Sequence, residues 1–178
     1  MEVAEQTITT NTSNIKVQKR DGRLEPLDID KIHFVVEEAC EGLTGVSSSQ
    51  IEINANIQFY DGITTKDIQH VLVKSANDLI SLENPNYQYA AARLLSYDVR
   101  KEAHGQYEYI PLLKLILRNI KLGVYDRTIV EKYSSSDIKK LNTWIKRDRD
   151  LDFTYAGLRQ VVDKYLVQDR SSGELYET

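Results

Sequence analysis

The N-terminal region constrains the fold most, because a tight turn and a capped helix follow each other directly. The run IKVQKR has the pattern of an extended strand, an Asp-Gly pair marks a turn, and RLEPL follows as a second arm. Asp28 is then placed as the N-cap of a helix in which apolar residues recur at helical spacing from Ile29 to Leu43. The sequence therefore predicts a β-hairpin that leads into an amphipathic helix, ended by Gly42 and Gly45.

A second helix is predicted to start at Ser47, although the segment IEINANIQF alternates apolar and polar residues as a strand would. The Ser-Ser-Ser-Gln sequence before it is a capping-box pattern, which favours the helix. On that helix, Ile53, Ile57 and Tyr60 are expected to face inward.

Two more helices are predicted before residue 105. Thr64 and Thr65 precede a third helical pattern, and Asn84-Pro85 opens a fourth that runs to about Lys101. Residues 15–104 are thus expected to be one unit, a β-hairpin that caps a four-helix bundle.

The second half is predicted to be helical up to about residue 165, with Asp126, Ser134 to Ser136 and Thr154 as caps. The end, KYLVQDRSSGELYET, has a Ser-Ser-Gly turn that indicates a C-terminal β-hairpin. The fold class is therefore mainly α with small β elements. Residues 1–14, rich in Thr, Asn and Ser, are expected to be a flexible leader.

Charge and composition exclude several classes of function. The 178 residues carry a formal net charge of −4, whereas a general nucleic-acid or anionic-membrane binder needs a basic surface. The sequence has no apolar run long enough to cross a bilayer and no secretory pattern, so cytoplasmic residence is expected. A single cysteine, Cys40, excludes a disulfide framework and a multi-cysteine zinc site, and the three histidines lack ligand spacing.

The charges around the first turn allow two interpretations. Lys19 and Arg20 precede the turn, Glu25 follows it, and Asp28 and Lys31 lie at the start of the helix. They could form a solvated hairpin with cross-strand ion pairs, or a site that binds phosphates at one end and a base or ribose at the other. Spacing alone leaves both open, because no glycine-rich phosphate loop is present.

Four stretches, VQKRDGRLEPLDIDKI, EEACEGL, QFYDGITTKDIQ and YQYAAARLLSYDVRK, resemble an ATP-cone, and most closely that of the large (alpha) subunit of class I ribonucleotide reductases. The likeness continues through GQYE, GVYD, DRDLDFTYAGL and KYLVQDRSSGELYET, so it covers about residues 15–178. It implies an ATP-cone over residues 15–104 and the helical start of the large-subunit body over residues 105–178, truncated before the catalytic barrel. The chain is then a fragment or a separately encoded piece, and the short final strand favours a fragment.

The resemblance also implies a function and a set of site residues. The cone would bind ATP or dATP, with Mg²⁺, as allosteric effectors that control the reduction of ribonucleotides for DNA synthesis. Lys19, Arg20, Thr65 and Lys101 would hold the phosphates, and Glu25 and Asp28 would address the adenine end. The positions that match the nucleotide-lining motif are Val17, Lys19, Arg20, Glu25, Leu27, Asp28, Lys31, Ile32, Thr65, Gln69, Tyr97 and Lys101.

Two positions depart from the pattern of the family. Asp28 stands where close relatives often have Asn, and Gln69 stands where His is common. Both departures bear on the discrimination between ATP and dATP more than on binding itself.

No catalytic residue is expected in this chain. The reduction needs a cysteine thiyl radical and a dithiol pair, and Cys40 is expected to be a buried structural cysteine. The implied partners are the rest of the alpha subunit, a radical-generating beta subunit and further alpha subunits, without nucleic acid or membrane. Two alternatives are a cone-bearing transcriptional regulator, which would need a cysteine-rich zinc ribbon that this sequence lacks, and a nucleotide-independent helical interaction module.

Overall fold

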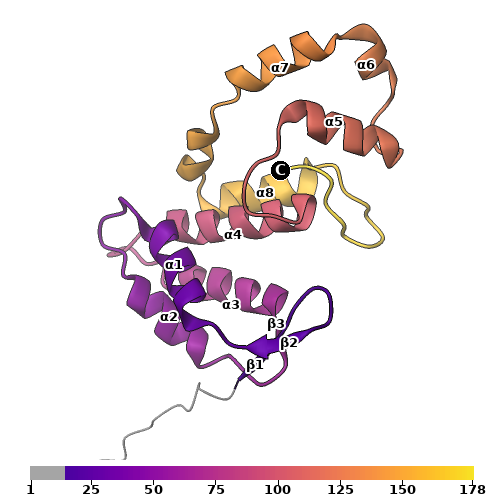
Figure 1. The fold of residues 1–178 in the computed structure, drawn as a ribbon. Helices are drawn as coiled ribbons and strands as arrows, with labels where there is room; N and C mark the ends of the chain where they lie inside the picture. The colour runs from indigo at the N-terminus through magenta and orange to yellow at the C-terminus, as the bar shows by residue number, and fades with distance from the viewer. Residues whose placement is uncertain (1–14) are drawn as a thin grey trace, which may run out of the picture.

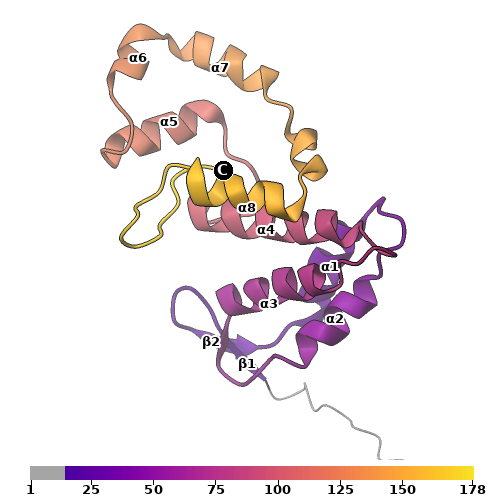
Figure 2. The same ribbon diagram turned by 180° about the vertical axis from the view of Figure 1, so that it is seen from behind.

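The computed structural model of the protein describes residues 15–178, and the leader predicted for residues 1–14 lies outside this range. The described residues are mainly helical, with a small sheet near their N-terminal end (Figure 1). Helix α4 (Tyr87–His104) lies in the middle: it contacts α1 (Ile29–Cys40) and α3 (Thr65–Asp78) on one side and α8 (Tyr155–Lys164) on the other (Figure 2). Because of this position, α4 joins α1 and α3 to the C-terminal helix α8.

The predicted hairpin is present, and it belongs to a three-stranded sheet. Strands β1 (Lys16–Gln18) and β2 (Leu24–Pro26) pair antiparallel. The sequence did not predict β3 (Ile63–Thr64), which pairs parallel to β1 and makes the strand order β2-β1-β3. A strand of two residues has no alternation to detect, and its pairing partner lies far away in the sequence.

The four helices predicted before residue 105 are confirmed: α1, α2 (Ser48–Asn56), α3 and α4. Their starts follow local chemistry, since the side chains of Asp28, Ser47 and Thr64 each accept a hydrogen bond from the backbone N–H three residues later. Gly105, at φ +74°, ends α4 with a left-handed turn.

The predicted inner face of α2 is wrong. Ile53 and Ile57 are 60% and 76% exposed, whereas Ile51, Ala55 and Phe59 are buried. Both sets follow a helical spacing, so periodicity could not choose between them. The choice is made by the packing of α2 against α1 and α3.

The second half contains α5 (Leu112–Lys121), α6 (Thr128–Lys132), α7 (Ser135–Trp144) and α8, and a 3₁₀ helix, Arg147–Asp152, that the sequence did not predict. The predicted caps at Ser134 and Thr154 are confirmed: Ser134 and Asp137 form a capping box, and Thr154 accepts from the N–H of Gly157. The predicted cap at Asp126 is wrong, because the N-cap residue of α6 is Arg127, without a side-chain cap hydrogen bond. Asp126 precedes it and accepts from the N–H of Thr128.

The predicted C-terminal β-hairpin is wrong. The end of the described chain forms a long loop with one isolated antiparallel bridge, between Gln168 and Leu175 (Figure 1). The reason lies in α5, because Arg118 Nη2 and Asn119 Nδ2 donate to the carbonyl of Tyr176 at 2.6 and 2.9 Å. The carbonyl of Tyr176 already accepts two hydrogen bonds from α5, so it is not available for a further hydrogen bond between two strands.

One hydrophobic core runs through α1 to α4 and reaches α8. Helix α4 contributes Ala90, Ala91 and Leu94, all fully buried, and its small side chains allow neighbouring helices to approach closely. Leu158 and Val162 of α8 belong to the same core. Burial of one such leucine or valine contributes roughly 1.5–3 kcal/mol, so this packing fixes the elements that surround the site.

Candidate functional site

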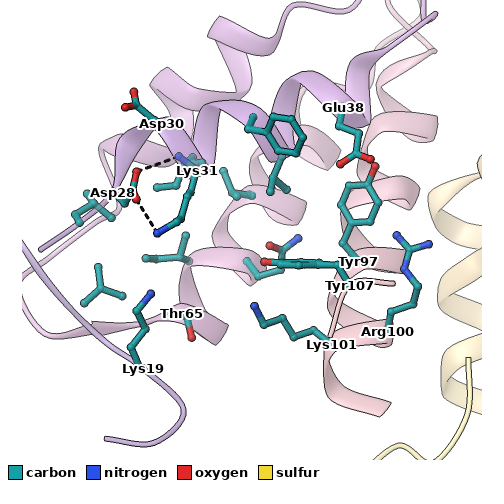
Figure 3. A pocket seen from close by; sticks show the side chains of 18 of the residues that line it. Lys19, Asp28, Asp30, Lys31, Glu38, Thr65, Tyr97, Arg100, Lys101 and Tyr107 are labelled. Atoms are coloured by element: carbon teal, nitrogen blue, oxygen red, sulfur yellow. Dashed lines mark hydrogen bonds and ion pairs between the residues drawn. The ribbon is translucent and has the colours of Figure 1, made fainter. Parts of the chain in front are cut away.

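A cavity of about 1120 Å³ opens between the hairpin, α1, the start of α3 and the end of α4 (Figure 3). It brings together residues from four separate parts of the sequence. The predicted site residues that line it are Val17, Lys19, Leu27, Asp28, Lys31, Ile32, Thr65, Gln69, Tyr97 and Lys101.

Two predicted residues lie outside this cavity. Arg20 donates from Nη1 to the carbonyl of Lys101 at 3.1 Å and lines a neighbouring hollow of about 20 Å³. Glu25 forms ion pairs with Lys19 at 3.3 Å and with Arg23 at 3.4 Å. Both residues therefore contact residues at the edge of the cavity and do not line it.

Cationic side chains approach one end of the cavity from two sides. Lys19 follows β1, and Lys101 comes from the last turn of α4, with its ammonium 4.1 Å from the ring centroid of Tyr107 (Figure 3). Thr65 is the first residue of α3, so the positive end of that helix dipole lies at the same end. Such an arrangement suits an anion, and phosphate groups in particular.

Asp28 lies at the other end of the cavity, where its carboxylate already contacts two groups of Lys31. Its Oδ1 accepts from the backbone N–H of Lys31 at 3.2 Å, and its Oδ2 is 2.8 Å from the ammonium of the same residue. These hydrogen bonds hold the pKa of Asp28 below its ordinary value and raise the pKa of Lys31. The site therefore contains an ionised acceptor here, paired with a cation from the first turn of α1.

Gln69 is buried, and its side chain joins two helices. Its Nε2 donates to the carbonyl of Leu94 at 2.8 Å. This hydrogen bond fixes α3 against α4 beside the cavity, so the amide has a structural role whatever the cavity binds.

The walls between the two ends are apolar or aromatic. Ile32, Ile68 and Leu72 supply aliphatic surface, and Tyr97 points toward Glu38 of α1 (Figure 3). Burial raises the pKa of Tyr97 to about 12, so its hydroxyl stays protonated at neutral pH. Apolar walls with a few fixed polar groups are typical of small-molecule sites.

Eleven further residues line the cavity that the sequence did not assign to the site: Pro26, Asp30, Phe34, Val35, Glu38, Ile68, Leu72, Arg100, Tyr107, Glu108 and Tyr109. A signal existed for the last three, because the cluster Tyr-Glu-Tyr directly follows the turn at Gly105. Arg100 sits next to the predicted Lys101, and its buried Nε has no hydrogen-bond partner among the described residues.

A buried carboxylate lies next to the cationic end. Asp98 of α4 is 5% exposed, and its Oδ2 is 3.1 Å from Nε2 of His70. Burial raises the pKa of Asp98, against the opposing effect of His70. Asp98 also lines the small hollow beside Arg20, so its carboxyl group lies close to the predicted phosphate-binding residues.

The remaining chemistry of the described residues is limited. Burial raises the pKa of the half-buried Cys40 thiol to about 11, which keeps it protonated at neutral pH. Within residues 15–178, no group of three or more His, Cys, Asp or Glu side chains could hold a metal ion. In the same range, every helix is too short or too polar to cross a membrane.

Comparison with known proteins gives the domain and its relatives. Residues 15–102 match the model of the ATP cone domain. The chain is 47% identical over 165 residues to ribonucleoside-diphosphate reductase 1 subunit alpha of Escherichia coli, which covers 93% of this chain and 22% of the relative. The corresponding alpha subunits of Haemophilus influenzae and Helicobacter pylori are 41% and 38% identical over 93% and 90% of this chain.

The match covers most of this chain but only a small part of each relative. The chain spans about a fifth of the length of these relatives, with 22%, 22% and 20% covered. The matched part is the N-terminal part of those alpha subunits. Residues 15–102 therefore belong to the ATP-cone family, and the chain corresponds to the N-terminal region of class I ribonucleotide reductase alpha subunits.

Proposed function

We propose that this chain is the allosteric region of a ribonucleoside-diphosphate reductase alpha subunit and that its cavity binds ATP or dATP. The observation that carries the proposal is convergence: side chains from the hairpin, α1, α3 and α4 meet at one cavity within a domain of the ATP-cone family. A volume of about 1120 Å³ is ample for a nucleoside triphosphate.

The charge distribution favours one orientation of the ligand. Lys19, Thr65 and Lys101 would hold the phosphates, because cations and the start of α3 meet at that end. Asp28 and the apolar wall would take the adenine and ribose. Mg²⁺ would bind mainly through the phosphate oxygens, as is usual for a triphosphate.

The proposed role is regulatory and follows from linkage. A ligand can control a distant reaction only when it binds two arrangements of the protein with different affinities. ATP and dATP would therefore favour different assemblies of the alpha subunit with the radical-generating beta subunit and with further alpha subunits. The reduction itself needs several thiols, whereas this chain has one cysteine with a protonated thiol.

Titration calorimetry of the chain with ATP and with dATP, in buffer with Mg²⁺, tests the proposal. Lys19→Ala and Lys101→Ala should each weaken binding by about 1–3 kcal/mol, because each removes a charge-assisted hydrogen bond to phosphate. Two matched controls, Lys16→Ala and Lys74→Ala, remove exposed lysines that do not line the cavity and should leave affinity unchanged. Binding heats absent from the folded wild-type chain would rule the proposal out.

One observation favours a second candidate, the nucleotide-independent interaction module. Lys19 and Lys31 already form ion pairs, with Glu25 and Asp28, so the cations do not require a ligand to be satisfied. The same titration separates the two candidates, because a cone without a ligand gives no heat with either nucleotide.

A further inference from the structure

We propose that the nucleotide site is completed from outside the cone. Tyr109, fixed by Arg147 and Asp150 of the 3₁₀ helix, is a positioning residue for Arg100 in the cavity wall. Nucleotide binding and the docking of residues 147–152 against Tyr109 are thereby coupled. This inference rests on the proposed function of the cavity.

The chain reverses at the end of α4 and returns along the cavity. Gly105 adopts φ +74°, and its N–H donates to the carbonyl of Lys101 at 2.9 Å. Arg20 donates to the same carbonyl and so holds the corner from the hairpin side. Residues 107–109 therefore line the cavity, although they lie beyond the matched family region, residues 15–102.

Cations and aromatic rings then alternate from the cavity to the 3₁₀ helix. The guanidinium carbon of Arg100 lies 4.8 Å from the ring centroid of Tyr97 and 4.5 Å from that of Tyr109. The guanidinium of Arg147 lies 4.1 Å from the ring centroid of Tyr109. We call Tyr97, Arg100, Tyr109 and Arg147 the stacked row. Each contact is attractive because a cation faces the electron-rich ring.

The hydroxyl and the neighbouring backbone of Tyr109 are also held by the 3₁₀ helix. The Tyr109 hydroxyl donates to the carboxylate of Asp150, and Arg147 Nη2 donates to the carbonyl of Ile110 at 3.4 Å. Both partners come from Arg147–Asp152. The position of the Tyr109 ring, and hence of Arg100, therefore depends on whether that helix is docked.

The charges of the stacked row explain why an anionic ligand should strengthen the docking. Arg100 and Arg147 approach the same ring, and Lys101 lies on the adjacent Tyr107. The buried Nε of Arg100 has no hydrogen-bond partner among the described residues. A triphosphate in the cavity would offset this positive charge, and by reciprocity a docked 3₁₀ helix would raise affinity for the nucleotide.

Titration calorimetry with ATP and Mg²⁺ on three variants tests the coupling. Arg147→Gln should weaken ATP binding by about 2- to 10-fold, the range expected for one cation–ring contact. Arg149→Gln is the matched control, because Arg149 is an exposed arginine in the same 3₁₀ helix, and it should bind as the wild type does. Arg147→Lys keeps a cation over the ring and should recover most of the affinity.

Amide hydrogen exchange distinguishes this coupling from a purely structural role of Arg147, because only the coupling makes exchange over residues 147–152 depend on ATP. Saturating ATP should slow amide exchange over residues 147–152 in the wild type, by the same factor of about 2 to 10 that the coupling gives to affinity. Arg147→Gln should lose this slowing and keep the slowing at the starts of α1 and α3.

The outcomes separate the two proposals. A wild-type chain that gives no heat with ATP overturns both. A wild-type chain that binds ATP without slower exchange over residues 147–152, or an Arg147→Gln chain that binds as tightly as the wild type, overturns the coupling and leaves the cavity's function in place. If Arg147→Gln does not fold, the wild-type exchange experiment decides alone.

Discussion

The cone and the segment that follows it are built differently, although both are helical. In the cone, α1 to α4 share one continuous core, which also takes in part of α8. The arch formed by α5, α6 and α7 buries Ile116, Asn119 and Ile138, while Trp144 at its end is 65% exposed (Figure 1). A side chain in a continuous core touches many neighbours, so its loss affects the whole unit, whereas a satellite cluster reports locally. The cavity between the hairpin, α1, α3 and α4 lies in the region with the continuous core, and the 3₁₀ helix that contacts Tyr109 follows directly after the arch.

The largest expected effect comes from replacing a buried isoleucine by alanine in each of the two regions. Ile51→Ala, in the cone core, should lower the free energy of unfolding by about 2–5 kcal/mol, because it leaves a cavity among fixed neighbours. Ile138→Ala, in the arch, should cost less and act locally, since Ile138 is buried outside the main core. Denaturant unfolding followed by circular dichroism, with hydrogen exchange to locate the change, measures both. Equal losses in the two variants would show that the arch and the cone unfold as one unit.

A smaller effect should appear in the pH dependence of the cone. Burial raises the pKa of Asp98 above its ordinary value of 3.8, in a setting that also includes His70, Glu102, Lys66 and Arg20. The protonated form therefore contributes stability that is fully present below pH 3.8 and is lost as the pH rises through the raised pKa. Asp98→Asn should make the unfolding midpoint less dependent on pH above 3.8. Parallel curves for the variant and the wild type would contradict this.

The smallest expected effect compares a histidine of the cone with one at its boundary. A hydrogen bond that His33 donates to the carboxylate of Glu52 raises the pKa of His33, so this contact between α1 and α2 contributes stability that is present below pH 6.5 and lost as the pH rises through the raised value. Burial lowers the pKa of His104, so its contribution is present above pH 6.5 and lost as the pH falls through the lowered value.

Substitution of each histidine should therefore change the pH profile in opposite directions. His33→Gln should reduce stability more on the acid side of pH 6.5, and His104→Gln more on the alkaline side. Thermal melts at pH 5.5 and pH 8.5 compare the two variants. A loss of stability that is larger at the same one of these two pH values in both variants would contradict the opposite pKa shifts.

Much of the local structure could be predicted because its causes are local. Asp28 and Ser47 cap the helices that they were predicted to cap, and the Asp-Gly turn forms the predicted hairpin. A cap or a turn is decided by a side chain and a backbone group a few residues apart. Ten of the twelve residues that the resemblance assigned to the site line one cavity, and their role in binding stays a prediction.

The sequence by itself determined the hairpin, the caps and the charges that the cavity would contain. The tertiary structure alone decided which face of α2 is buried, that β3 joins the sheet, that the carbonyl of Tyr176 binds α5, and that Tyr109 closes the wall under Arg147. Each of these outcomes depends on contacts between residues that are far apart in the sequence. Two faces of a helix with the same periodicity, or a short polar segment, contain no local signal that predicts such contacts. Local hydrogen bonding therefore fixed the elements, and long-range packing and charge completed the site.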